Sequence, residues 1–221
     1  MQASRLHWFA AALVFAAGAA QAQQAGSWLG RIGVTNINPQ VDSGNLSAPS
    51  LPNTKVDVND DTQLSGGITY MVNDHIAVDV PLALPFKHTL SGDGAIAGVG
   101  KIGDVKAFPV TVLGQYRFLE ANAKVRPYLG AGITYARFYD EQSTAALSAL
   151  TGGSPTTFSV DSKWAATIQA GVVAMINERW FVDGMVAKTF LKTSAKLSTG
   201  QSIDLKLDPL SLSIGVGMRF Y

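Results

Sequence analysis

Cysteine is absent from this chain of 221 residues, so no disulfide can stabilise its fold. Charge is scarce as well: 15% of the residues are charged, whereas soluble domains usually carry about 25%. Because 47% of the residues are hydrophobic, this composition conflicts with an ordinary secreted globule. After residue 22, no apolar run approaches the length of a membrane-spanning helix. The apolar surface must therefore be spread over short segments.

The N-terminal segment has the three parts of a secretory signal peptide. Arg5 precedes the apolar stretch WFAAALVFAAGAA at residues 8–20, and AQA at residues 20–22 is a small-x-small cleavage site. A transmembrane helix would need about 20 apolar residues. We therefore predict that residues 1–22 are removed and that the mature protein begins at Gln23. Their removal takes away Arg5 and no acidic residue, which lowers the formal net charge from +1 to 0, so nucleic acid is not an implied partner.

Eight segments of the mature chain have the length and alternating polarity of transmembrane β-strands. They are 27–36, 62–72, 75–86, 105–118, 125–139, 161–176, 179–191 and 207–221. The connections alternate between short (73–74, 119–124, 177–178) and long (37–61, 87–104, 140–160, 192–206). The sequence therefore predicts an all-β fold: residues 23–221 form an eight-stranded antiparallel transmembrane β-barrel with short periplasmic turns and long extracellular loops. Residues 141–150 are the best candidate for a helix within the loops.

Side-chain size indicates which face of each strand points outward. In 161–176, one face carries large apolar residues such as Trp164 and Ile168, while the other is leaner and includes Thr167 and Gln169. The leaner face suits a narrow lumen better than a solvated exterior, which would be richer in Lys and Glu. The large apolar residues are therefore expected to face lipid.

Aromatic residues gather at strand ends, as they do in the two girdles of a membrane barrel. Strands of 10 residues with about 3.3 Å rise and a tilt of about 40° span roughly 25 Å, the height of the apolar band. The rings of a soluble core would have no reason to cluster in this way. The predicted periplasmic girdle contains Trp28, Tyr70, Tyr116, Phe118, Trp180 and Phe220, and the predicted outer girdle contains Phe86, Phe108, Tyr135, Trp164 and Phe190.

Six segments, in order along the chain, resemble the outer membrane protein W (OmpW) family of small eight-stranded barrels. They are GGITYMVNDHIAVDV (66–80), LPFKHTL (84–90), PVTVLGQYRF (109–118), VRPYLGAGITY (125–135), DSKWAATIQAGVVAMINERWFVD (161–183) and LDPLSLSIGVGMRF (207–220). The loops 38–60 and 141–158 match poorly. Phe220 aligns with the phenylalanine on which such barrels usually end, which makes Tyr221 an additional residue.

The resemblance implies a bacterial outer-membrane protein that admits small hydrophobic molecules passively, through a narrow apolar passage that opens sideways into the bilayer. Some relatives import alkanes, and others serve as receptors for phages or bacteriocins. The expected partners are outer-membrane lipids, small hydrophobic solutes and, during biogenesis, the barrel-assembly machinery.

Six charged residues have inward parity on the predicted strands, mostly in the periplasmic half. They are Arg31, Asp79, Arg117, Arg126, Asp183 and Arg219. A lumen of eight strands is about wide enough for side chains to fill, so these charges are expected to pair with one another and to form a plug. An apolar solute could not pass straight through such a plug and would need an exit through the wall.

Prolines indicate where the wall is weakest, because proline cannot donate to a strand ladder. Pro81, Pro85 and Pro109 lie toward the extracellular ends of the third and fourth predicted strands. We predict a lateral exit between these two strands. The candidate passage residues are Pro81, Leu82, Leu84, Phe86 and Trp164. Through the resemblance, Trp164 corresponds to a tryptophan associated with the hydrophobic gate of the family; alternatively, it is only a girdle anchor.

Other motifs do not support catalysis or cofactor binding. The segment 98–103 fits G-x-G-x-x-G, but no strand leads into it and no helix follows. His75 and His88 lack the spacing of metal ligands, and Ser91 near His88 lacks a nucleophile elbow and a third orienting group. We therefore expect no enzyme activity, no cofactor and no metal.

Two functions remain open. One is a passive conduit for small hydrophobic molecules, and the other is a structural or receptor barrel whose loops form the binding surface. An apolar inner surface in the extracellular half would favour the conduit, and a filled, ionic one would favour the anchor.

Overall fold

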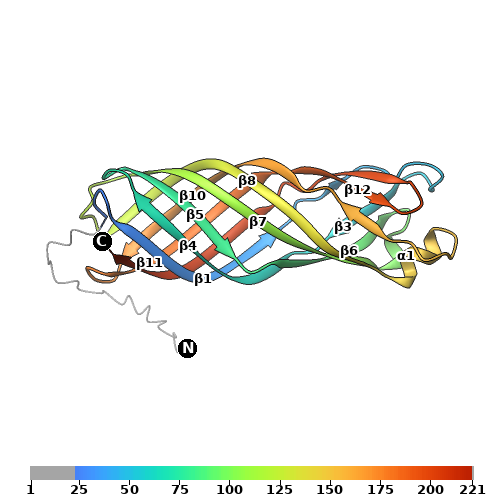
Figure 1. Ribbon diagram of the computed structural model, residues 1–221, viewed down its shortest axis with the longest axis horizontal. Coiled ribbons are helices and arrows are strands. Elements are labelled where there is room, and N and C mark those ends of the chain that lie inside the picture. The colour runs from blue at the N-terminus through green and yellow to red at the C-terminus, as the bar shows by residue number, and fades with distance from the viewer. Residues whose placement is uncertain (1–22, 221) are drawn as a thin grey trace, which may run out of the picture.

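The computed structural model describes residues 23–220, which form a closed antiparallel β-barrel with both ends of the described chain at the same end of the barrel (Figure 1). The signal peptide predicted at residues 1–22 lies outside the described residues and stays a prediction. Pairing of β1 with β14 and of β7 with β8 closes the barrel. Its eight strands are β1 (Trp28–Asn38), β4 (Asp61–Met71), β5 (Ile76–Ala83), β7 (Lys101–Arg117), β8 (Val125–Ser143), β10 (Lys163–Met175), β11 (Trp180–Phe190) and β14 (Leu210–Phe220).

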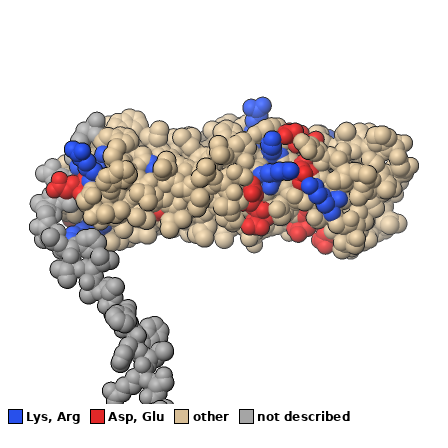
Figure 2. Space-filling view, turned by 90° about the horizontal axis from the view of Figure 1, so that it is seen from below, with Lys and Arg blue, Asp and Glu red and all other residues tan. Residues whose placement is uncertain are grey.

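The predicted fold class and the eight predicted strands are confirmed, and so is the outward direction of the large apolar side chains. On β10, Thr167 and Gln169 are buried inside the barrel, whereas Trp164 and Ile168 are exposed on its outer surface. Ile32 on β1 is 78% exposed. Large apolar side chains are exposed in this way only when the surrounding medium is itself apolar. Figure 2 shows a largely uncharged belt between one zone of charge near the end that carries the termini and another toward the loop end.

The long connections are more regular than predicted. They contain β2 (Asp42–Ser43), β3 (Thr54–Val58), β6 (Phe86–Gly94), β9 (Phe158–Val160), β12 (Lys192–Leu197), β13 (Ser202–Lys206), a 3-10 helix (Ala97–Val99) and α1 (Ala145–Leu150). β3 pairs with β6, while β2, β13, β12 and β9 form a second sheet. The helix expected within 141–150 is α1, whose N-cap Thr144 accepts a hydrogen bond from the backbone N–H of Leu147. No helix in the part of the chain that the structure describes is long and apolar enough to cross a membrane.

These additional strands lengthen the barrel beyond its apolar belt and enclose an apolar core of their own. Figure 1 shows β3, β6, β12 and α1 at the end of the barrel opposite the termini. Leu90, Ile102, Val105, Ile203 and Leu205 are buried together there. We call this part the extracellular extension. Its alternating segments, such as TKVDV in β3, are too short to be distinguished from loop sequence by pattern alone.

Candidate functional site

All but one of the aromatic residues predicted as girdles lie on the outer face of the barrel. At the periplasmic edge, Trp28 pairs in register with Tyr70 on one side and Phe220 on the other, and Tyr116 contacts Phe118 at 5.0 Å between ring centroids. The outward rings are Trp28, Tyr116, Phe118, Trp164, Trp180, Phe190 and Phe220, with Tyr70, Phe108 and Tyr135 half-buried on the same face.

One predicted girdle residue is wrong: Phe86 points into the barrel and is fully buried. The chain leaves β5 after Ala83 and re-enters the sheet as β6 at Phe86. Leu84 still faces outward, while Phe86 and His88 face inward. The irregular connection at Leu84 and Pro85 therefore exchanges the two faces, because strand alternation is preserved only within a continuous strand.

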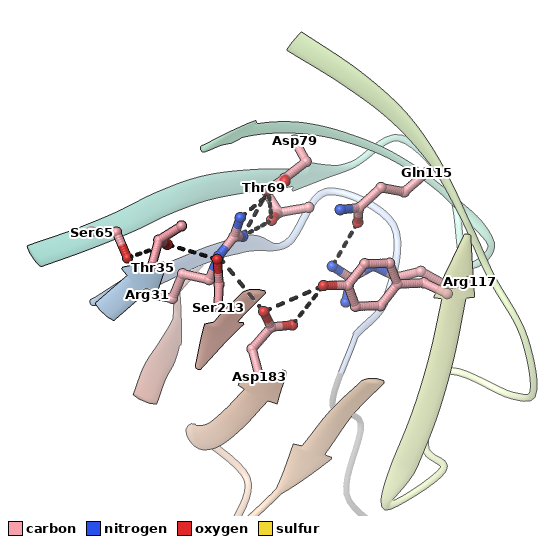
Figure 3. A network of polar contacts seen from close by, with 10 residues as sticks. Arg31, Thr35, Ser65, Thr69, Asp79, Gln115, Arg117, Asp183 and Ser213 are labelled. Carbon is pink, nitrogen blue, oxygen red and sulfur yellow. Dashed lines mark hydrogen bonds and ion pairs between the residues drawn. The ribbon is translucent and has the colours of Figure 1, made fainter. Parts of the chain in front are cut away.

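The periplasmic half of the lumen holds a polar network (Figure 3). The Asp79 carboxylate accepts hydrogen bonds from Arg31 at 2.7 and 3.0 Å and from the hydroxyl of Thr69 at 2.6 Å. Arg31 also lies 3.8 Å from Asp183, which accepts a 3.1 Å hydrogen bond from the hydroxyl of Tyr128. Arg31, Asp79 and Asp183 thus pair as the sequence predicted.

The Arg31–Asp79 pair depends on a glycine between them. Arg31 is on β1 and Asp79 is on β5, so the guanidinium must reach over β4, where Gly67 is the residue in register with Arg31. A Cβ atom at Gly67 would lie 2.7 Å from the Cζ atom of Arg31. The absence of a side chain at this position therefore gives the guanidinium its path to Asp79.

For Arg117 and Arg126, the predicted pairing with carboxylates is wrong within the described residues. Arg117 donates to the side-chain oxygens of Gln23 and Gln115 at 2.6 and 2.9 Å, and its guanidinium lies over the ring of Tyr128. Arg126, which is fully buried, donates to backbone carbonyls, including those of Gln23 and of the residues at 118–119. Inward arginines outnumber inward aspartates here, so neutral oxygens accept the remaining hydrogen bonds. Arg219 is also buried on the inner face.

Above this network lies a cavity of about 140 Å³, which is the candidate site. Most of its wall is apolar, including Pro81, Phe86, Leu113, Ala187 and Leu207, while Arg31 and Asp183 belong to its lining where it meets the network. A second apolar cavity, of about 220 Å³, lies in the extracellular extension. Leu90 and Leu205 line both cavities, so the two are adjacent.

His88 is a polar residue in the wall of the first cavity, at the level of the extracellular extension. Its ring donates from Nδ1 to the backbone carbonyl of Asn59 at 2.8 Å. Burial lowers the pKa of His88, although Asn59 and the nearby Asp61 and Asp60 favour the charged form. The ring is therefore neutral at neutral pH, which suits an apolar cavity.

The wall beside the cavity has a break in its backbone ladder, which we call the β5–β7 seam. β5 pairs with β7 only from Ile76 to Asp79, and pairing with β7 resumes at Phe86 of β6. Between these points, residues 80–83 pair with β4 alone, and residues 108–112 of β7 pair with β8 alone. Pro81 and Pro109 fall in these two segments. Leu82 and Ala83, in the unpaired stretch of β5, belong to the lining of the inner cavity.

The predicted passage residues do not form one cluster. Pro81 and Phe86 face the cavity, and Leu82 lies at the seam. Leu84 is exposed on the outer surface. Trp164 is 68% exposed on β10, with β7 and β8 between it and β5, and it packs on Tyr135 at 5.0 Å between ring centroids. Trp164 thus lies outside the barrel and away from the seam, where the alternative of a girdle anchor places it.

Sequence reasoning missed two polar features of the lumen. Four threonines on neighbouring strands are joined by hydrogen bonds of 2.8, 2.6 and 2.9 Å; in order they are Thr111, Thr134, Thr167 and Thr189. Gln169 lines the same cavity. Inward parity was visible for these residues, but nothing in the sequence distinguished them from other lumen residues. No group of three or more His, Cys, Asp or Glu side chains among residues 23–220 could hold a metal ion.

Comparison with known proteins identifies the family. The OmpW family model matches residues 24–220. Outer membrane protein W of Vibrio cholerae is 33% identical over 210 residues, which cover 90% of this chain and 91% of that protein. The dibenzothiophene metabolism operon protein PahQ of Pseudomonas aeruginosa is 28% identical over 197 residues, covering 87% and 88% of the two chains. The crystal structure of the outer membrane protein OprG from Pseudomonas aeruginosa has a TM-score of 0.83 at 28% identity, and the match covers 91% of this chain and 99% of that one. The predicted family and the predicted outer-membrane location are thus confirmed: this chain belongs to the OmpW family of outer-membrane β-barrel proteins.

Proposed function

We propose that this barrel is a passive conduit, without catalysis, for small apolar molecules. The solute enters through the extracellular extension, occupies the cavity above the polar network, and leaves sideways through the β5–β7 seam into the outer leaflet. The observation that carries the proposal is the position of the seam: the one stretch of wall where the third and fourth barrel strands are unpaired over the described residues lies directly beside the apolar cavity.

The polarity of the lumen favours a sideways route over a straight one. Below the cavity, a solute would have to separate Arg31 from Asp79 and displace the buried Arg117 and Arg126. Breaking a buried ion pair costs about 3–5 kcal/mol, and an apolar solute offers these charges no replacement partner. Leaving through the seam exposes the solute only to apolar side chains and then to acyl chains, where each CH₂ group contributes about 0.8 kcal/mol relative to water.

The relatives support an apolar solute. PahQ is named for a dibenzothiophene metabolism operon, and dibenzothiophene is an uncharged fused aromatic. The apolar lining of both cavities in this chain suits molecules of that character. The alternative function, a receptor or structural barrel, requires no passage and is tested by the same experiment.

Reversible crosslinking across the seam tests the proposal, and the chain contains no cysteine that would interfere. Leu82→Cys with Val110→Cys introduces two outward thiols on opposite sides of the seam. Val186→Cys with Leu212→Cys is the matched control, because these outward residues pair in register on β11 and β14, on the far side of the barrel. Each pair is joined by a flexible bifunctional thiol reagent that contains a disulfide, and crosslinking is verified by mass spectrometry.

The measurement is uptake of naphthalene by intact cells that produce each variant. We expect crosslinking at the seam to reduce uptake to the level of cells without the protein, and reduction of the reagent to restore it. Cells that produce the control variant should take up naphthalene equally well with the crosslink intact and after its reduction. Equal uptake before and after crosslinking at the seam would exclude the lateral route, and uptake no greater than in cells without the barrel would favour the receptor function.

A further inference from the structure

Gln169 is an unusual feature of the cavity. It lies on β10 with 4% of its surface exposed, and neither its amide nitrogen nor its amide oxygen has a hydrogen-bond partner among the described residues. No other residue of the cavity lining has a buried side-chain nitrogen or oxygen without a partner in this part of the chain. Leaving a buried polar group unsatisfied costs about 1–3 kcal/mol, so a buried amide with two free atoms needs an explanation.

The neighbours of Gln169 cannot supply the missing partners. In register beside it are Gly130 on β8 and Ala187 on β11, which have no polar side chains. A Cβ atom at Gly130 would lie 2.9 Å from the Cγ atom of Gln169, so the glycine leaves room for the glutamine side chain. The nearest lumen hydroxyl along β10, Thr167, already bonds Thr134 and Thr189.

Below Gln169, side-chain oxygens of the network accept hydrogen bonds from other members of the network. The side-chain oxygen of Gln115, which is in register with Gly130, accepts from Arg117, and Asp183 accepts from Tyr128. Gln169 thus presents a donor nitrogen and an acceptor oxygen, both unpartnered among residues 23–220, where the apolar cavity meets the polar network.

We propose that Gln169 binds the polar end of the conducted solute, while the apolar body of the solute fills the cavity above it. This inference rests on the proposed function and specifies which of the conducted solutes the cavity binds best: a small aromatic molecule or a short aliphatic chain that ends in one uncharged group able both to donate and to accept a hydrogen bond. A hydroxyl group has both capacities and matches the two atoms of the amide.

The size and the charge balance of the site support this class. The cavity volume of about 140 Å³ is close to the roughly 150 Å³ of an engineered apolar cavity that accepts benzene. The ionised groups nearby, Arg31, Asp79 and Asp183, already have partners, so a charged end group would enter without a counter-ion and is disfavoured. When Gln169 binds the polar end, the apolar part of the solute would contact the apolar side chains that line the cavity.

Phenol and toluene provide a direct test, because they differ in one group, hydroxyl against methyl, at similar size. The full mature barrel in lipid nanodiscs is titrated with each compound, with free concentrations corrected for partition into empty nanodiscs. Side-chain amide NMR follows the binding, and Gln169→Leu identifies the Gln169 resonance by its loss. Gln142→Leu is the matched control, since Gln142 lies outside both cavities and bonds Asp140 in the extracellular extension.

We expect phenol, and not toluene, to shift the Gln169 amide resonance. Gln169→Leu should weaken phenol binding about tenfold, which corresponds to the loss of one or two neutral hydrogen bonds, and should leave toluene binding unchanged or tighter. Gln142→Leu should change neither affinity. If Gln169→Leu does not fold, as judged by its gel mobility without heating, Gln169→Met replaces it.

Several results would overturn the assignment. If Gln169→Leu changes the two affinities equally, or changes neither, the amide does not recognise the solute and at most holds ordered water. A failure of this inference is distinguishable from a failure of the proposed function. If toluene binds and naphthalene is taken up, but phenol binding does not depend on Gln169, only the role of Gln169 is refuted. If the wild-type barrel neither binds these compounds nor takes up naphthalene, the conduit itself is refuted.

Discussion

Removing Asp79 should destabilise the barrel strongly, because Asp79 is the acceptor on which the polar network depends. Its fully buried carboxylate accepts two hydrogen bonds from Arg31 and one from Thr69. In Asp79→Ala, the Arg31 guanidinium stays buried with Asp183 at 3.8 Å as its remaining ionic partner. Breaking a buried pair by removing one member costs about 3–5 kcal/mol, and 3 kcal/mol corresponds to a decrease of about a hundredfold in the folding equilibrium.

The double variant Arg31→Met with Asp79→Leu should recover most of this loss, because apolar replacement of a buried pair is often neutral or stabilising. Recovery should stay incomplete, since Asp183 then loses Arg31 and keeps the hydroxyl of Tyr128. Asp161→Ala is the control. It removes two solvent-accessible pairs, with Lys163 at 3.5 Å and with Lys196 at 4.0 Å, and exposed pairs contribute little.

Equilibrium unfolding in urea, with the barrel in lipid vesicles, measures these differences. Trp28, Trp164 and Trp180 lie on the outer surface of the barrel, so tryptophan fluorescence reports their transfer from lipid to water. An Asp79→Ala barrel as stable as the wild type would refute the reasoning. A double variant as unstable as Asp79→Ala would also refute it, because the cost would then come from lost packing and not from the uncompensated charge.

Three further predictions concern single residues. Gln169→Leu should raise the unfolding free energy of the empty barrel by about 1 kcal/mol or more, because it removes unpaired buried polar atoms. The urea midpoint should rise accordingly, and a lower midpoint would show that the amide is satisfied. For His88, burial lowers the pKa in the folded state. The unfolding free energy should therefore be unaffected by His88 above about pH 6.5. It should decline as the pH falls below that value, because the unfolded chain then takes up a proton more readily than the folded one. His88→Gln should remove that decline between pH 7.5 and pH 5, and an identical decline in both proteins would contradict the assignment. Trp164→Ala should leave naphthalene uptake unchanged, because Trp164 faces outward and away from the seam; loss of uptake in a folded variant would return this residue to the passage.

The barrel strands could be predicted from sequence because their signal is local. Along β10, the large apolar residues Trp164 and Ile168 alternate with the polar Thr167 and Gln169, and exposed and buried positions follow a period of two over most of the 13 residues. The extracellular extension lacks such a signal. β2 pairs with β13, where Asp42 lies opposite Lys206, and no local pattern indicates that residues so far apart in the chain meet. The same limit explains Phe86, whose direction depends on an irregular turn before it and not on its own residue type.

The sequence predicted which side chains of the candidate site point into the barrel, but not which residues they contact there. Inward parity identified Arg31, Asp79 and Asp183, and the structure joins them. Their partners, however, depend on the stagger between strands and on which intervening residue lacks a side chain. The path of Arg31 to Asp79 across Gly67 requires both the register of β1 with β4 and that of β4 with β5. Without these registers, Gly67 is only one of 22 glycines.

The position of the seam relative to the polar network connects the fold to the proposed conduit. Asp79 is the last residue of β5 that pairs with β7, and Pro81 follows two residues later in the unpaired stretch. The residue that closes the lumen and the residue that weakens the wall are therefore neighbours on one face of one strand, since inward parity recurs every second residue. In the proposed conduit, a solute stopped by the Arg31–Asp79 pair would be held at the height where the ladder is interrupted. If Asp79 or the unpaired stretch at Pro81 lay two residues further along β5, the ion pair and the lateral opening would be at different heights. A lateral route requires the two to be adjacent, whereas a structural or receptor barrel does not.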